Sequence, residues 1–124
     1  MLGYEIDDED DSPVYRQWGY YKVIHKGDGY TVKELTILPG KSLSDQRHFK
    51  RAEHWLIVKG NLAVDIADEN IGDSFTSIIN AGFVNNSLFI DTEVWHRPYN
   101  NGTENVVVIE TWLGDSSEED IERR

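Results

Sequence analysis

Four polar side chains combine the residue types and the spacing of a mixed nitrogen and oxygen metal site. Gln46 and His48 are two residues apart on a predicted strand, so their side chains point to the same face. Glu53 begins the next predicted strand, and a bend can return its carboxylate to the same cavity. His96 lies on a later predicted strand. We predict one divalent ion here, zinc in the first place. Manganese, cobalt, nickel and iron are alternatives, because ligand type alone does not choose among them.

The strands that must position these residues are short and follow one another closely. Apolar and alternating runs predict strands at 20–24, 30–38, 54–58, 62–67, 88–90, 94–96 and 106–113. Turn signals at 27–29, 59–61 and 100–102 separate several of them. This spacing predicts an all-β sandwich or barrel. Residues 68–87 are predicted to form a loop with one irregular strand, and residues 116–124 a short helical turn.

The length and the composition predict one folded domain without covalent cross-links. The chain has 124 residues and no cysteine, so neither a disulfide nor a thiolate ligand is available. No apolar run approaches the roughly 20 residues of a membrane span. No basic segment followed by an apolar one marks a secretory signal. These features predict a soluble, cytoplasmic protein.

The net negative charge of the chain argues against two classes of binding partner. The formal net charge is −11, with 23 acidic and 12 basic residues, and much of the acidic excess lies in residues 5–11 and 115–122. Such a chain repels nucleic acid and acidic membranes, so neither is an expected partner. Residues 1–13 are predicted to be a flexible acidic lead, and residues 14–124 to be the folded domain. An anionic ligand needs a local cluster of basic side chains.

The spacing of the candidate ligands resembles the two sequence motifs of the cupins. Their first motif has a glycine, two ligands separated by one residue, a glutamate and a second glycine. It fits with every gap kept at Gly40, Gln46, His48, Glu53 and Gly60. Their second motif ends in Pro-x-Gly-x-x-His-x-x-x-Asn. His96 and Asn100 fit it, while Asp91 and Glu93 replace the proline and the glycine. The resemblance implies a single cupin domain, which is a double-stranded β-helix or jelly-roll barrel.

A narrower resemblance covers about residues 15–122. Several stretches are similar to the cupin domain of type II mannose-6-phosphate isomerases, namely 16–21, 43–48, 51–55, 96–97 and 118–121. That family uses glutamine as its first ligand, which fits Gln46. It often carries histidines where this chain has Phe49 and Lys50, and its link between the two motifs is usually shorter than 68–86 here. The domain often follows a mannose-1-phosphate guanylyltransferase, which is not expected within so short a chain.

The narrower resemblance implies a reaction and a set of partners. The family interconverts mannose 6-phosphate and fructose 6-phosphate, which serves the GDP-mannose pathway and polysaccharide biosynthesis. A proton moves between C1 and C2 through a cis-enediol, and the phosphate needs cationic donors. The implied partner is therefore a small phosphosugar. The resemblance also implies a homodimer, with Arg16, Trp18 and Tyr20 as candidate contacts.

Basic side chains near the predicted ligands are candidates for the phosphate or for the enediolate. Arg51 precedes Glu53 by two residues, so alternation places both on one face of a strand. Lys33 lies on an earlier predicted strand. Arg97 adjoins His96, although strict alternation turns it to the other face. The simpler interpretation of both arginines is pairing with carboxylates.

Candidate proton carriers are Glu110, in an otherwise apolar predicted strand, and His54, beside Glu53. Burial would raise the pKa of Glu110 and suit it to work near neutral pH. For His54 the simpler interpretation is that it faces the other side of its sheet.

Two further functions remain open beside the isomerase. One is a non-catalytic cupin module that binds a sugar or a sugar nucleotide, or that regulates a partner; the acidic charge and the altered second motif favour it. The other is a different metal-dependent cupin enzyme, such as a dioxygenase or a nucleotide-sugar isomerase. A dioxygenase usually has more histidine ligands, so Gln46 argues against that reaction.

Overall fold

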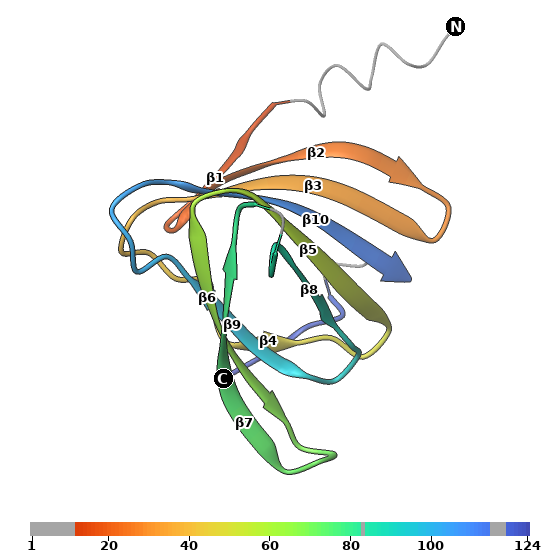
Figure 1. Cartoon of the computed structure of the whole chain (residues 1–124). Coiled ribbons are helices and arrows are strands. Elements are labelled where there is room, and N and C mark those ends of the chain that lie inside the picture. The colour runs from red at the N-terminus through yellow and green to blue at the C-terminus, as the bar shows by residue number, and fades with distance from the viewer. Residues whose placement is uncertain (1–11, 83, 115–118) are drawn as a thin grey trace, which may run out of the picture.

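The fold consists of two antiparallel sheets that close into a barrel (Figure 1). A computed structural model describes residues 12–82, 84–114 and 119–124. One sheet has the order β1 (Val14–Arg16), β2 (Gly19–Gly27), β3 (Tyr30–Ile37), β10 (Val106–Gly114), β5 (Arg51–Lys59) and β8 (Ser87–Ile90). The other has the order β11 (Glu122–Arg123), β4 (Gln46–Arg47), β9 (Trp95–Tyr99), β6 (Asn61–Asp68) and β7 (Asp73–Asn80). The expected all-β class is confirmed.

Two expectations about local structure were wrong. The irregular strand expected within residues 68–87 is the regular strand β7, which pairs with β6 along its whole length, from Asn61 opposite Asn80 to Asp68 opposite Asp73. The expectation of a helical turn at 116–124 is also wrong for residues 119–124, which the structure describes. There the chain forms β11, which pairs with β4. The residues expected to cap that turn lie outside the described residues.

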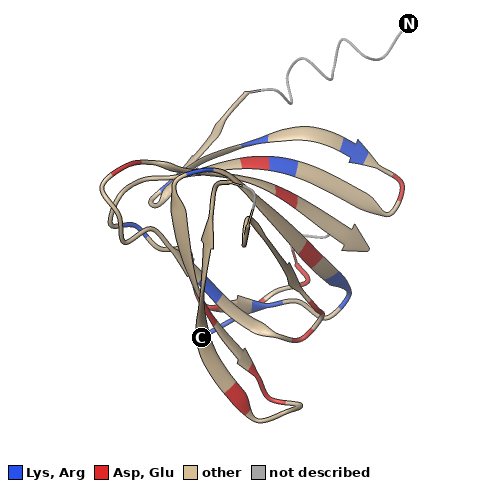
Figure 2. Ribbon diagram, viewed as in Figure 1, with Lys and Arg blue, Asp and Glu red and all other residues tan. Residues whose placement is uncertain are grey.

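The acidic lead expected at residues 1–13 lies outside the described residues except for Ser12 and Pro13. Within the described ranges, no helix is long and apolar enough to cross a membrane. Acidic and basic segments lie side by side on the strands of the larger sheet (Figure 2).

Apolar side chains fill one end of the space between the sheets. This core contains Leu35, Ile37, Trp55, Ile57, Leu62, Val64, Ile66, Ile79, Ile90, Val94, Val106 and Val108. β5 and β6, which belong to different sheets, connect through a tight turn at Gly60, whose φ of +81° lies in the left-handed region. A Cβ there would lie 2.9 Å from the carbonyl oxygen of Asn105, so only glycine lets the two backbones approach this closely.

The inner face of the larger sheet changes from apolar to charged between neighbouring rows of β3 and β10. Val108 of β10 pairs with Leu35 of β3 and Ile57 of β5, which makes an apolar row. One alternation further along β10, Glu110 pairs with Lys33 and Trp55. Because side chains two residues apart share a face, Lys33 and Glu110 point into the barrel beside the apolar core. The register therefore places charged groups at the end of the barrel that the apolar side chains do not fill.

Candidate active site

Three buried side chains form a cluster that can hold a metal ion. His48, Glu53 and His96 each offer a ligand atom, and these atoms lie within 4.8 Å of one another. The Nε2 atom of His48 is 3.1 Å from Oε2 of Glu53, and Nε2 of His96 is 3.6 Å from Oε1. At most 3% of each side chain is exposed. The predicted histidine and glutamate ligands thus converge from the β4–β5 segment and from β9.

Backbone carbonyls fix the orientation of both imidazoles. Nδ1 of His48 donates to the carbonyl oxygen of Asp120 at 2.6 Å, and Nδ1 of His96 donates to that of Val94 at 2.9 Å. A carbonyl can only accept, so in each neutral ring the proton sits on Nδ1 and the lone pair on Nε2. Both lone pairs therefore face Glu53, which is the arrangement that metal-binding histidines use.

The cluster leaves one buried atom without a hydrogen bond, and a metal ion fits it. Among the described residues, Nε2 of His96 has no hydrogen-bond partner. A buried nitrogen lone pair without a partner costs free energy unless it binds a cation. Nε2 of His48 accepts from Arg51 at 3.2 Å, since a guanidinium can only donate. Two imidazoles and a carboxylate are donors that suit zinc and the other divalent transition metals.

The carboxyl group of Glu53 is held in its ionised form. Burial raises its pKa, but the neighbouring His48 and His96 outweigh burial, so the pKa of Glu53 lies well below its ordinary value. Nε of Arg51 also donates to Oε2 of Glu53 at 3.1 Å. An ionised carboxylate is the form that binds a metal.

Glu110 lies next to this cluster but has the opposite electrostatic environment. Burial raises the pKa of Glu110 well above its ordinary value, and the nearby negative charge of Glu53 raises it further. The indole N–H of Trp55 links the two carboxyl groups, at 3.0 Å from Oε2 of Glu110 and 3.2 Å from Oε1 of Glu53. The site thus lowers the pKa of one carboxyl group and raises that of its neighbour, which separates a ligand role from a proton-transfer role.

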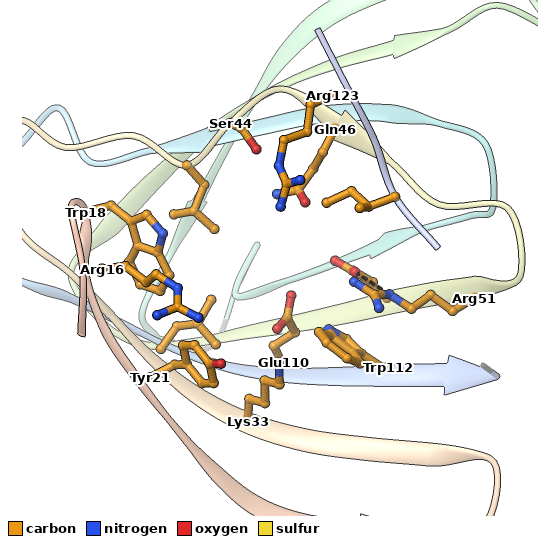
Figure 3. Close-up of a pocket in the computed structure, with 14 residues that line it drawn as sticks. Arg16, Trp18, Tyr21, Lys33, Ser44, Gln46, Arg51, Glu110, Trp112 and Arg123 are labelled. Atoms are coloured by element: carbon orange, nitrogen blue, oxygen red, sulfur yellow. Dashed lines mark hydrogen bonds and ion pairs between the residues drawn. The ribbon is translucent and has the colours of Figure 1, made fainter. Parts of the chain in front are cut away.

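A cavity of about 180 Å³ opens beside these groups (Figure 3). Its lining is Arg16, Trp18, Tyr21, Lys33, Leu35, Leu43, Ser44, Gln46, Arg51, Glu53, Glu110, Trp112, Ile121 and Arg123. Lys33, Glu110 and Trp112 belong to the larger sheet, whereas Gln46 and Arg123 project from the smaller one. Glu53 belongs both to this lining and to the three-residue cluster, so a ligand in the cavity can reach a metal held there.

The structure brings most of the predicted site residues to this cavity. Lys33, Arg51 and Glu110 line it, and all three are buried. Gln46 also lines it, and Gln46 pairs directly with His96 across β4 and β9, so both side chains lie on the same face. The role of Gln46 as a fourth ligand stays a prediction.

Two predicted catalytic residues lie elsewhere. His54 alternates with Arg51, Glu53 and Trp55 on β5 and is half-buried on the other face of the sheet. Arg97 donates to Asp65 at 2.7 Å and to the hydroxyl of Ser42 at 3.1 Å, outside the cavity. Strand alternation accounts for both positions, so neither residue is retained as a candidate.

Sequence reasoning missed a second group of residues at the cavity. Arg123 and Ile121 reach the cavity because the C-terminal segment adds strand β11 beside β4. Asp120 precedes them and contacts the ligand His48 through its carbonyl oxygen. No apolar alternation marks so short a strand. The only available signal was the similarity of 118–121 to the isomerase family.

Comparison with known proteins matches the chain to one family model and to several curated relatives. Residues 5–124 match the family model described as Mannose-6-phosphate isomerase C-terminal. The chain is 36% identical over 107 residues to a mannose-1-phosphate guanylyltransferase of Salmonella muenchen, which covers 86% of this chain and 21% of that protein. It is 39% identical over 114 residues to the alginate biosynthesis protein AlgA of Pseudomonas putida, and this match covers 89% of this chain and 21% of AlgA. The chain thus spans about a fifth of the length of these curated relatives.

Solved structures confirm the fold. The capsular polysaccharide assembling protein CapF of Staphylococcus aureus superposes with a TM-score of 0.79 at 16% identity, over 90% of this chain and 32% of that one. Oxalate oxidase in complex with glycolate superposes with a TM-score of 0.65 at 17% identity, over 77% of this chain and 46% of the oxidase chain. At these identities the likeness concerns the fold. The expected cupin fold is confirmed.

Proposed function

Because the chain belongs to the mannose-6-phosphate isomerase C-terminal family, we propose that it is a metal-dependent isomerase of mannose 6-phosphate and fructose 6-phosphate. One observation carries this proposal. A His48–Glu53–His96 cluster, with both Nε2 atoms facing the carboxylate, adjoins a cavity that also holds a protonatable Glu110. A metal centre beside a separate proton carrier is what an aldose–ketose isomerisation needs.

The ligands proposed for the ion are His48, Glu53 and His96, with Gln46 as the fourth. When bound, a divalent ion supplies Lewis-acid polarisation of the sugar carbonyl and orients the hydroxyl groups. Zinc is the proposed ion, and manganese, cobalt, nickel and iron suit the same donors. Because both imidazoles are already turned by their backbone hydrogen bonds, the protein spends little free energy in arranging these ligands.

Glu110 is the proposed proton carrier. In the forward direction its carboxylate takes the proton from C2, which leaves an enediolate with its charge on the C1 oxygen. The proton of the C2 hydroxyl moves to the C1 oxygen, and Glu110 then returns its proton to C1, which gives the ketone. A carboxyl group with a raised pKa is suited to both half-reactions near neutral pH.

Two buried cations support the charge that develops during this transfer. Lys33 pairs with Glu110 across β3 and β10, and its ammonium lies 3.6 Å from the ring centroid of Trp112. The guanidinium of Arg51 lies 3.5 Å from the same centroid and donates to Glu53. Preorganised cations in a buried site stabilise an enediolate more than the same charges in water would. Lys33 is assigned to the enediolate, and Arg51 to the position of Glu53.

The test is turnover by protein of known metal content. Metal-stripped protein would be reloaded separately with zinc, manganese, cobalt and iron, and fructose 6-phosphate would be followed after addition of mannose 6-phosphate. We expect turnover with at least one ion. Glu53→Gln should lose both bound metal and turnover, whereas the matched control Glu34→Gln, on the outer face of β3, should keep both. Metal-loaded protein that binds the sugar phosphate without converting it would instead support a binding module.

A further inference from the structure

Among the described residues, two arginines differ from the others in forming no ion pair with a carboxylate. Other arginines lie within 4.0 Å of a carboxylate oxygen, namely Arg47, Arg51, Arg97 and Arg124. Among residues 12–82, 84–114 and 119–124, Arg16 and Arg123 form no such ion pair, although the chain has 23 acidic residues against 12 basic ones. Both of these arginines line the cavity. Their positive charge is therefore available to a ligand.

The position of Arg123 follows from strand register. Arg123 pairs with Gln46 across β11 and β4, and Gln46 pairs with His96 across β4 and β9. Side chains that face each other in this way share one face of the sheet. Two strand spacings place Arg123 about 10 Å from the ligand His96 along the smaller sheet. A hexose phosphate whose reacting carbons lie at the metal cluster would extend its phosphate in this direction.

Arg16 approaches the same space from the other sheet (Figure 3). It ends β1, and its guanidinium lies 5.5 Å from the ring centroid of Tyr21, which stacks on Trp18. One of its nitrogens, Nη1, donates to the carbonyl oxygen of Tyr15 at 3.1 Å, which leaves the other N–H groups of the fork for a ligand. In Figure 3, Arg16 and Arg123 enter the cavity from different walls.

We propose that Arg16 and Arg123, which line the cavity from its two sheets, form the subsite that binds the phosphate monoester of the substrate. This inference rests on the proposed function for the identity of the sugar. Guanidinium groups suit the subsite because their planar forks bind two phosphate oxygens each. The buried cations Lys33 and Arg51 serve the reacting end instead, because they lie beside Glu110 and Glu53. Phosphate recognition and proton transfer thus use different basic residues.

The first test separates binding from chemistry in steady-state kinetics. Arg16→Gln and Arg123→Gln should each raise KM for mannose 6-phosphate by about tenfold or more, with a smaller change in kcat. The double variant should lose more than either single variant. Arg97→Gln is the matched control, since Arg97 pairs with Asp65 outside the cavity, and its KM should match that of the unmodified protein. An unchanged KM in the double variant would refute the subsite.

A second test does not depend on turnover. Calorimetry would measure the binding of mannose 6-phosphate, mannose and inorganic phosphate to zinc-loaded protein and to the double variant. We expect the double variant to lose the preference for mannose 6-phosphate over mannose and to bind inorganic phosphate at least tenfold more weakly. This loss in a protein without isomerase activity would support the subsite and overturn the proposed function. Equal binding by both proteins would overturn the subsite even if turnover were present.

Discussion

At the scale of single residues, the site depends on two imidazoles that are positioned before any ligand arrives. His48 and His96 both use Nδ1 on a backbone carbonyl, so the protein directs Nε2 of each ring toward Glu53. Binding of an ion there displaces any proton from Nε2, so metal affinity is expected to fall as the pH falls. The unpartnered Nε2 of His96 is the clearest sign that the cluster serves a cation.

Glu110→Gln tests the proton carrier. Glutamine keeps the size of the side chain but cannot exchange a proton, so kcat is expected to fall about 100-fold or more, with bound metal unchanged. Glu110 is buried, and burial together with the charge of Glu53 raises its pKa. Steady-state kinetics on protein of measured metal content would check this. A variant with normal kcat would remove Glu110 from the mechanism.

At the scale of the elements, the short C-terminal strand supports the metal cluster as well as the cavity. Asp120 accepts hydrogen bonds from the backbone amides of Phe49 at 3.0 Å and Lys50 at 2.8 Å, and its own carbonyl accepts from His48. The same segment then adds β11 to the sheet and brings Arg123 into the cavity. One C-terminal segment, residues 120–123, therefore connects the proposed phosphate subsite to a proposed metal ligand.

Asp120→Asn tests this support. Partial burial raises the pKa of Asp120, but the amides of Lys50 and Phe49 outweigh it, so its pKa is lowered. A carboxyl group whose pKa is lowered in the folded state stabilises the fold at pH values above its ordinary pKa. This stabilisation is lost as the pH falls through the folded-state pKa. The variant should therefore be less stable than the unmodified protein at neutral pH. The difference should shrink in acid, and zinc affinity should fall about tenfold.

Asp65→Asn is the matched control for this prediction. The hydroxyl of Thr76 and the guanidinium of Arg97 lower the pKa of Asp65, against a smaller effect of burial. It should show the same sign of pH dependence in thermal unfolding but leave zinc affinity unchanged, because its side chain lies outside the cluster. Equal zinc affinity in Asp120→Asn and Asp65→Asn would show that Asp120 does not support His48.

Strand alternation predicted most of the longer strands, because the signal repeats along each of them, and motif spacing predicted the three cluster residues. They could not predict β11, which is too short to alternate, and so Arg123 was missed. Glu93, which stands where the second cupin motif has glycine, adopts the left-handed φ of +67° itself. Its amide also donates to the carbonyl oxygen of His48 at 2.6 Å, which joins this turn to the ligand segment.

At the scale of the whole molecule, the barrel separates stability from chemistry. Apolar rows such as Val108 with Leu35 and Ile57 fill one end, and the charged row of Glu110 and Lys33 begins one alternation further along the same strands. The rigid apolar end lets the other end hold buried charges in fixed positions. The homodimer that the family resemblance implies stays a prediction, which light scattering on the purified protein would check. Arg16, expected at its contact, is assigned instead to the proposed phosphate subsite.

The most direct test of the central claim is NMR of mannose 6-phosphate in D₂O with metal-loaded protein. The proposed mechanism predicts that fructose 6-phosphate appears with deuterium from the solvent at C1, because a carboxyl group that exchanges with water carries the proton. Metal-stripped protein should give no product. Mannose 6-phosphate that stays unconverted and free of deuterium, with every cluster occupied by metal, would contradict the assignment of this cupin domain as an isomerase.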